Sequence, residues 1–335
     1  MKENVKESYI YIWEFSGQLD KPIPDLIIVR PKTLRSLYRQ LTSKVIISNA
    51  GIGAYLPKRK NQYFINTWHG GGAYKRTGIA SSLNYSHYEQ RTATICAKQT
   101  DYFLSSSEKF TEVMADSKLV DKSRFLEVGM PRNDELVRQK NTQKITKAIK
   151  ERYNIPLDNK LVLYAPTYRG AEVAGYTDKS LDYEKCLVAL KEKFGGTWTL
   201  LLRQHLFVKT QDDGKKNRIN VSNYPNMQEL LQGVDVFITD YSSSMWDVSF
   251  LERPGFLYVS DIDQYASEIN FYTDPETWPF PLARDNDELG VSIANYDEVK
   301  NTNKIQAHHQ LLVNKETGEA SKKVVKLITE ICGGK

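Results

Sequence analysis

His69 lies in a segment whose composition favours chemistry on an anion. The apolar run 63–65 leads towards this histidine, and three glycines and then two cations, the first of them Lys75, follow it. A histidine with an ordinary pKa near ~6.5 can accept a proton at physiological pH. Glycines such as Gly70 and Gly71 leave backbone N–H groups open to a phosphate or a sugar. The alternative is a glycine-rich turn beside a buried, hydrogen-bonded histidine.

A second polar group follows a predicted strand in the segment 234–247. The residues after this strand are Thr239, Asp240, Ser242, Ser243 and Ser244. In open α/β sheets, ligands bind outside the carboxyl ends of the strands, and hydroxyl and N–H groups at a helix start can hold a phosphate. Asp247, one turn into the helix, can accept from a ribose or glycerol hydroxyl or orient a neighbour. The alternative is an ordinary helix cap with a solvated Asp247.

Other predicted strand ends also carry cations or a histidine. They are Arg132 after strand 125–128, Thr167 and Arg169 after strand 161–164, and Arg203 and His205 after strand 200–202. One such arginine is weak evidence, because arginine often pairs with a surface acid. Several at carboxyl ends predict a cleft that binds an anion. His87, His308 and His309 follow no such strand, so we interpret them as surface or structural residues.

Short β-branched runs alternate with stretches of helical periodicity along most of the chain. The predicted strands are 25–29, 45–48, 63–66, 102–104, 125–128, 161–164, 198–203, 219–221, 234–239 and 255–259. The predicted helices are 33–42, 105–116, 133–153, 182–193, 227–232, 243–251 and 321–331. This alternation indicates an α/β protein with parallel sheets covered on both faces.

The chain of 335 residues is longer than one hydrophobic core usually serves. We therefore expect two doubly wound, Rossmann-like lobes facing a central cleft. The predicted boundaries give an N-terminal lobe over 1–154, a C-terminal lobe over 155–318 and a C-terminal helix over 319–335 that is able to cross back to the first lobe.

Composition restricts the class of protein. The three cysteines, Cys96, Cys186 and Cys332, are far apart, so they predict neither a disulfide framework nor a zinc site and fit a reducing cytoplasm. The N-terminus has no signal-peptide pattern, and no apolar window reaches the ~18–20 residues that a spanning helix needs. We expect a soluble or peripheral protein.

Positive charge is concentrated at the front of the chain. Residues 1–60 contain 11 Lys and Arg against 5 Asp and Glu, whereas the remainder has 35 against 36. Such a basic region can meet an anionic membrane surface, a polyanionic acceptor or nucleic acid. The alternative is a solvated surface.

Several segments together make the chain resemble the CDP-glycerol glycerophosphotransferases of teichoic-acid and capsule synthesis. The segments are WHGGGAYK at 68–75, GMPRND at 129–134, LYAPTYR at 163–169, RQH at 203–205, ITDYSSSMWD at 238–247 and ERPGFLYVSD at 252–261. The resemblance covers roughly residues 44–272, and the order and spacing of the segments carry it. It implies a GT-B-like fold, a CDP-glycerol or CDP-ribitol donor and peripheral attachment to the cytoplasmic face of the membrane.

The resemblance also implies roles for individual residues. His69 and His205 match catalytic or donor-phosphate residues, and the segment 240–243 matches a pyrophosphate-binding segment accompanied by Asp247. Arg132 and Thr167 match positions near the donor. Two departures are Gly71-Gly72 where the family often has Thr-Pro, and Arg203-Gln204-His205-Leu206 where it often has Lys-x-His-Pro.

We expect His69 to be the base that deprotonates a hydroxyl of a lipid-linked saccharide or a polyol-phosphate chain, with CMP as the leaving group. His205, with Arg203 or Arg132, would stabilise the leaving group. In the alternative, the roles of His69 and His205 are exchanged. We expect neither a metal, another cofactor nor a nucleic-acid partner. Alternatives are a GT-B sugar transferase, a non-catalytic binding module for anionic polymers or nucleic acid, and an α/β-hydrolase, which needs a G-x-S-x-G segment that this sequence lacks.

Overall fold

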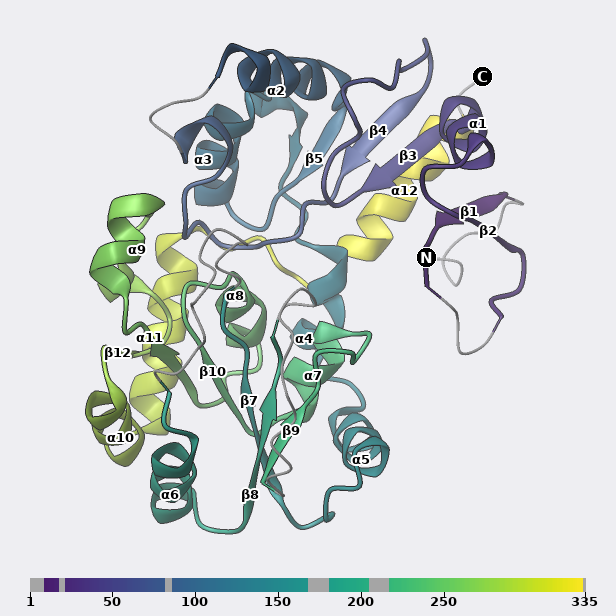
Figure 1. Ribbon diagram of the computed structural model, residues 1–335. Coiled ribbons are helices and arrows are strands. Elements are labelled where there is room, and N and C mark those ends of the chain that lie inside the picture. The colour runs from purple at the N-terminus through teal and green to yellow at the C-terminus, as the bar shows by residue number, and fades with distance from the viewer. Residues whose placement is uncertain (1–8, 18–21, 82–85, 168–180, 205–216, 334–335) are drawn as a thin grey trace.

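The computed structural model contains two α/β lobes, one above the other in Figure 1. It describes residues 9–17, 22–81, 86–167, 181–204 and 217–333. The first lobe is built on a parallel sheet with the strand order β3-β4-β5-β6. Its strands are β3 Val45–Ser48, β4 Tyr63–Asn66, β5 Tyr102–Leu104 and β6 Phe125–Leu126. Its helices are α2 His87–Gln99 and α3 Glu108–Lys118, with single turns η2 Gly78–Ala80 and η3 Lys122–Arg124.

A small unit precedes this lobe and lies beside it in Figure 1. It consists of a two-stranded parallel sheet and one helix, namely β1 Tyr11–Glu14, β2 Leu26–Val29 and α1 Leu34–Thr42. The helix begins where the Thr33 side chain accepts a hydrogen bond from the N–H of Ser36. The predicted strand 25–29 therefore forms, but it belongs to this small sheet and not to the main sheet of the first lobe.

The second lobe has a parallel sheet with the strand order β12-β11-β10-β7-β8-β9. Its strands are β7 Lys160–Tyr164, β8 Trp198–Leu202, β9 Arg218–Asn220, β10 Val236–Thr239, β11 Gly255–Tyr258 and β12 Leu282–Ala283. Read from β9, this is the doubly wound order in which the direction of winding changes between the first strand, β7, and the fourth, β10. Ligands of such sheets bind at the carboxyl ends of the strands beside this change.

Both faces of the second sheet are buried. The side chains of Leu161 and Leu163 join one core cluster, and those of Val162 and Tyr164 join another on the opposite face. The covering helices are α6 Tyr183–Phe194, α7 Met227–Gly233, α8 Ser244–Ser249, α9 Ile262–Glu268, α10 Asn286–Ala294 and α11 Glu298–Leu311, with a turn η5 Pro275–Thr277. Alternate burial on two faces explains the continuous apolar runs of these strands.

The stretch predicted as one helix over 133–153 is broken. After the turn η4 Pro131–Asn133, it forms α4 Asp134–Arg138 and α5 Thr142–Arg152. Gln139 and Asn141 between them have φ of +50° and +66°, which a helix cannot contain. Leu136 and Ile149 of these helices pack in the core of the second lobe, so packing against that lobe begins before residue 155.

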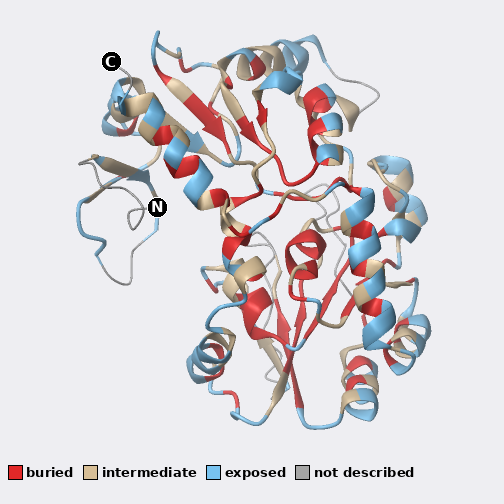
Figure 2. Ribbon diagram, turned by 180° about the vertical axis from the view of Figure 1, so that it is seen from behind, coloured by how far each residue is buried: buried red, intermediate tan, exposed pale blue. Residues whose placement is uncertain are grey.

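The last helix, α12 Ala320–Gly333, returns to the first lobe. Its Val324 and Ile328 pack in the same core cluster as Phe103 of β5, and Figure 2 shows the buried stripe along it. The Asp134 carboxylate caps it, accepting from the N–H of Ala320 at 2.9 Å and of Ser321 at 2.8 Å. Among the described helices, none has the length and apolar character needed to cross a membrane.

Candidate active site

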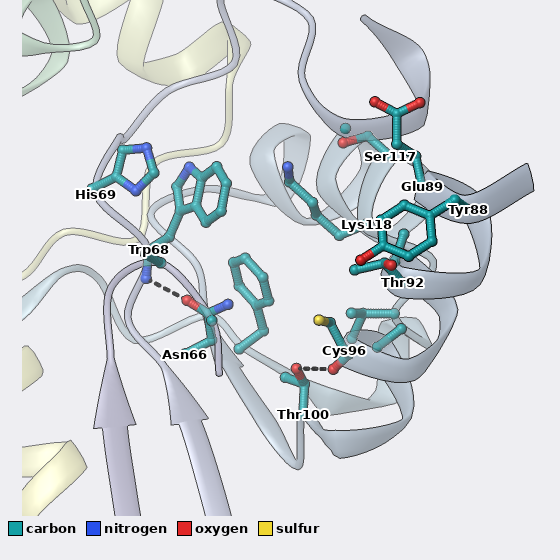
Figure 3. Close-up of a pocket in the computed structure, with 17 residues that line it drawn as sticks. Asn66, Trp68, His69, Tyr88, Glu89, Thr92, Cys96, Thr100, Ser117 and Lys118 are labelled. Atoms are coloured by element: carbon teal, nitrogen blue, oxygen red, sulfur yellow. Dashed lines mark hydrogen bonds between the residues drawn. The ribbon is translucent and has the colours of Figure 1, made fainter. Parts of the chain in front are cut away.

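The loop after β4 directs His69 away from the first-lobe sheet. Asn66, the last residue of β4, accepts a hydrogen bond on Oδ1 from the N–H of Trp68 at 2.8 Å. Trp68 has φ +52°, a left-handed conformation that is rare for large side chains. Its indole stacks on the imidazole of His69 with ring centroids 4.3 Å apart, as Figure 3 shows. A strained turn thus fixes the direction of the histidine.

The tautomer of His69 follows from its hydrogen bond. Nδ1 lies 2.8 Å from the carbonyl oxygen of Asn49. Because a carbonyl only accepts, Nδ1 carries the hydrogen and Nε2 of the neutral ring is free to take a proton. Burial lowers the pKa of His69; the bond to Asn49 opposes this, and the charges of Arg132, Lys118 and Lys75 reinforce it. The side chain is therefore neutral at pH 7, as a general base must be.

Trp68 and His69 both line three cavities. The first-lobe cavity, of about 320 Å³, lies between Trp68 and helices α2 and α3. Two further cavities are lined by residues of both lobes. We call them the Arg132 cavity, of about 500 Å³, and the Lys75 cavity, of about 440 Å³, each after one residue that lines it. A group held in any of these spaces can therefore approach the same imidazole.

The glycines after His69 lie against helix α8 of the second lobe. A Cβ on Gly71 would lie 2.1 Å from Cδ1 of Trp246, and one on Gly70 would lie 2.9 Å from Oγ of Ser243. Such distances are shorter than any ordinary contact, so only bare backbone allows the two lobes to approach here. Both glycines also line the Lys75 cavity. Both glycines are buried and serve the packing of the lobes; that they also leave N–H groups open to a ligand stays a prediction.

The segment after the glycines is bound to the second lobe by its main chain. The carbonyl of Ala73 accepts from Oγ1 of Thr273 at 2.7 Å, and that of Tyr74 accepts from the N–H of Tyr272 at 2.6 Å. Lys75 forms an antiparallel bridge with Phe271 and lines the Lys75 cavity. These bonds hold Lys75 at the junction of the lobes.

The loops after β7 and β10 meet at the change of winding. The buried carboxylate of Asp240 accepts from the N–H of Thr167 at 2.8 and 2.9 Å and from its Oγ1 at 2.6 Å. Thr239 Oγ1 donates to the carbonyl of Ala165 at 2.6 Å. Asp240 and Thr239 thus hold the two loops together, and Thr167 lines the Lys75 cavity.

The serine run forms a wall shared by the two cavities between the lobes. Ser242 and Ser243 line both of them, and Ser244 lines the Arg132 cavity. Oγ of Ser242 accepts from Oγ of Ser244 at 2.8 Å and from its N–H at 3.3 Å. The Ser243 side chain caps no N–H of α8. Hydroxyl groups therefore line the side of each cavity that the second lobe supplies.

Arg132 and Asp247 form an ion pair between the loop after β6 and helix α8. Nε of Arg132 lies 3.1 Å from Oδ2 of Asp247, and Nη2 lies 3.0 Å from Oδ1. Gln228 Nε2 donates to the same Oδ2 at 3.3 Å. Because both carboxylate oxygens accept from Arg132, the structure supports the orienting role weighed for Asp247, and Arg132 is held against the Arg132 cavity.

The comparisons with known proteins agree with this geometry. The family described as CDP-glycerol:poly(glycerophosphate) glycerophosphotransferase matches residues 1–330. The chain belongs to this family. It is 31% identical to the teichoic acid poly(glycerol phosphate) polymerase of Staphylococcus epidermidis, over 96% of this chain and 46% of that protein. It is 30% identical to the polymerase of the same description from Bacillus spizizenii, over 97% of this chain and 85% of the relative.

Solved structures of family members confirm the predicted GT-B-like fold. The wall teichoic acid polymerase TagF superposes with a TM-score of 0.82 at 30% identity, over 97% of this chain and 82% of that one. UDP-GlcNAc 2-epimerase from Neisseria meningitidis superposes with a TM-score of 0.50 at 11% identity, over 89% of this chain and 79% of that one, which indicates a shared fold only. The chain spans about half of the Staphylococcus epidermidis relative, at 46% of its length.

Among the predicted family residues of the second lobe, the described Arg203 stands apart from the cavities. Arg203 Nη1 donates to the carbonyls of Tyr224 at 2.8 Å and Val221 at 3.4 Å, so this nitrogen supports the loop between β9 and α7. Arg203 lines none of the three cavities. His205 and Arg169 lie outside the described residues. In the described part of the chain, no group of three His, Cys, Asp or Glu residues can hold a metal ion.

Sequence reasoning missed Asn49 and Glu316. The carbonyl of Asn49 sets the His69 tautomer. Every residue type has a backbone carbonyl, so the sequence could not predict this contact. The Glu316 carboxylate accepts from the N–H of Met130 at 2.8 Å, Nδ2 of Asn133 at 2.9 Å and Nε1 of Trp246 at 3.3 Å. Burial raises its pKa to about 7. Glu316 joins the loop after β6, which carries Arg132, to helix α8, but no recognisable motif surrounds Glu316 in the sequence.

Proposed function

We propose that the protein transfers glycerol phosphate from CDP-glycerol to a hydroxyl of a polyol-phosphate chain or a lipid-linked saccharide, with release of CMP. The observation that best supports this reaction is the position of His69. Its tautomer is fixed by Asn49, and it lines the same two cavities as the hydroxyls of Ser242 and Ser243. The relatives named teichoic acid poly(glycerol phosphate) polymerases support the choice of donor and acceptor class.

The reaction requires one proton transfer and one exchange of P–O bonds. The acceptor oxygen attacks the β-phosphorus of CDP-glycerol while its proton passes to Nε2 of His69. The bond between the β-phosphorus and the oxygen bridging to CMP breaks, and its electron pair stays on CMP. A positioned general base contributes about 10²–10⁴-fold to such a rate.

Charge on the donor must be stabilised from the walls of the cleft. Arg132 lies at the Arg132 cavity and keeps its orientation through Asp247. The hydroxyls of Ser242, Ser243 and Ser244 offer donors to the diphosphate. His205, in protonated form, completes the proposed stabilisation of the leaving CMP.

The two lobes divide the substrates in this proposal. Residues 155–318 carry the donor site, because the change of winding lies there and ligands of such sheets bind beside it. Residues 1–154 carry the acceptor side. A relative from Bacillus spizizenii is named a teichoic acid ribitol-phosphate primase and is 26% identical over 88% of this chain and 77% of its own length, so CDP-ribitol is the second donor to test.

We also propose that helix α1 attaches the protein to the cytoplasmic face of the cell membrane. Its apolar residues Leu34, Leu37 and Tyr38 are 87%, 39% and 60% exposed, which is unusual for the apolar face of a helix. Arg35 and Arg39 lie on the same helix. Apolar side chains beside arginines are the pattern of a helix that lies in the surface of an anionic bilayer.

The decisive experiment is incubation with a lipid-linked acceptor and either CDP-glycerol or CDP-ribitol, with CMP and polymer length as readouts. Nucleotide sugars and UDP release test the sugar-transferase alternative in the same assay. We expect CMP release that depends on acceptor, and its loss in His69→Ala with CDP-glycerol binding retained. A His69→Ala protein with unchanged CMP release contradicts the assignment of the base.

A further inference from the structure

The first-lobe cavity shares Trp68 and His69 with the two cavities between the lobes, but no described residue of the second lobe lines it. Figure 3 shows the indole of Trp68 at one end and helix α2, with Tyr88, at the other. Its volume of about 320 Å³ suits a small unit of a polymer. The proposed donor site lies elsewhere, so this space is available to another ligand.

Lys118 brings a positive charge to this cavity. Its Nζ lies 4.4 Å from the centroid of the Trp68 ring. Gly78, with φ +58°, closes over it, since a Cβ there would lie 3.2 Å from Nζ. Within the described residues, Lys118 forms neither an ion pair nor a hydrogen bond. Burial lowers the pKa of its ammonium to about 8, because the cation is partly desolvated.

Asn66 offers a second donor to the same space. Its Oδ1 accepts from the N–H of Trp68, which fixes the orientation of the amide. Nδ2 therefore lies on the side of the amide that faces away from this hydrogen bond. Within the described part of the chain, this Nδ2 has no hydrogen-bond partner. In Figure 3 it points towards the cavity. A cation and an amide N–H₂ without acceptors favour an anionic ligand over a cationic one.

One carboxylate, that of Glu89, also lines the cavity. It is held at the start of α2, where Oε2 accepts from the N–H of Ser86 at 2.9 Å and from its Oγ at 2.6 Å. In Figure 3 this carboxylate lies on the Tyr88 side of the cavity, far from Trp68. The charge at the end of the cavity next to His69 is therefore that of Lys118.

We propose that the first-lobe cavity binds the acceptor, with the phosphodiester next to the attacking hydroxyl paired to Lys118. The glycerol carbons of the same unit lie against the aromatic ring of Tyr88, and the terminal hydroxyl reaches His69, which lines the same cavity. This inference rests on the proposed transfer reaction. It separates acceptor recognition, in the first lobe, from donor binding between the lobes.

The test compares Lys118→Met with Lys118→Arg and with Lys98→Met, which removes an exposed lysine of the neighbouring helix α2 outside the cavity. Steady-state kinetics at pH 7.5 use an acceptor that carries glycerol phosphate units, and glycerol 3-phosphate serves as a soluble competitor. Losing one charge-assisted contact predicts an acceptor KM about ten- to hundredfold higher in Lys118→Met and a similar weakening of glycerol 3-phosphate inhibition. Lys118→Arg keeps most of the affinity, and Lys98→Met leaves both values unchanged.

The dissociation constant of CDP-glycerol, measured by calorimetry, distinguishes a loss of acceptor binding from a loss of donor binding. We expect it to be the same in wild type and Lys118→Met, which also reports that the variant is folded. A wild-type protein that neither binds CDP-glycerol nor releases CMP overturns the proposed function. A wild-type protein that transfers glycerol phosphate, combined with an unchanged acceptor KM in Lys118→Met, overturns the acceptor site alone.

Discussion

The guanidinium of Arg132 and the carboxylate of Asp247 face each other at 3.0 and 3.1 Å, so that the first lobe and helix α8 share a two-point ion pair. The Asp247 side chain is 6% exposed and that of Arg132 is 22% exposed. The pair therefore acts at once as a lobe contact and as the support of a cation in the Arg132 cavity.

Replacing Arg132 by Met leaves the Asp247 carboxylate buried without its partner. Such a change typically costs about 3–5 kcal/mol, so we expect the free energy of unfolding to fall by about that amount. The measurement is urea denaturation followed by tryptophan fluorescence. Adding Asp247→Asn removes the unpaired charge and should restore part of the loss. Strictly additive effects of the two changes would contradict a direct coupling.

The exposed pair of Arg284 and Asp263 is a suitable control for this measurement. Its side chains are 57% and 93% exposed, and the nitrogen and oxygen lie 3.9 Å apart. We expect Arg284→Met to change the free energy of unfolding by about 0–1 kcal/mol, because an exposed pair stays hydrated.

Gly71→Ala should separate the lobes at α8. The added Cβ would lie 2.1 Å from Trp246 Cδ1, so the fully buried indole or the loop must move. We expect a lower melting temperature and a large loss of transfer activity. Gly290→Ala in α10, where nothing lies within 4 Å of the added Cβ, should be neutral or stabilise by about 0.5–1 kcal/mol. Equal melting temperatures for the two variants would show that the glycine is dispensable.

The strand ends of the site could be predicted, because apolar runs mark buried parallel strands and such strands end at one edge of a sheet. This placed His69, Thr167, Ser242 and Ser243 beside shared cavities from their order in the chain. The same reasoning did not predict which side chain or backbone group each of these residues contacts. Asp240 shows the limit: its sequence position indicates a ligand-binding edge, whereas its carboxylate is used to hold Thr167.

Contacts between distant segments explain what the sequence could not predict. Glu316 meets Met130 and Asn133 only because α12 returns to the first lobe. The apolar stripe of α1, with Leu34 and Tyr38, has the periodicity of a core helix, and only the structure shows that it is exposed. Periodicity shows which residues share a face of a helix but not what that face contacts.

The exposure of α1 leads to a prediction on membrane binding. In co-sedimentation with vesicles containing phosphatidylglycerol, Leu34→Ser combined with Tyr38→Ser should weaken binding about tenfold or more, because buried apolar area drives insertion. Val299→Ser, which changes a residue that is 69% exposed on α11, is the control and should bind as wild type. Binding that is unchanged in the double variant, or equal on neutral vesicles, would argue against attachment through α1.

The pH dependence of turnover tests the electrostatics around His69. A general base works only when unprotonated, so kcat/KM should fall as the pH drops through the pKa of the base in the free enzyme and stay constant above it. Burial together with the charges of Arg132, Lys118 and Lys75 lowers this pKa from 6.5, and the acid limb of kcat/KM should therefore lie below pH 6.5. Lys75→Gln removes one of these charges and should move the limb to higher pH. Lys109→Gln, on an exposed pair with Glu112, should leave it in place. A wild-type limb at or above pH 6.5, or identical limbs for Lys75→Gln and wild type, would assign the proton transfer to another group.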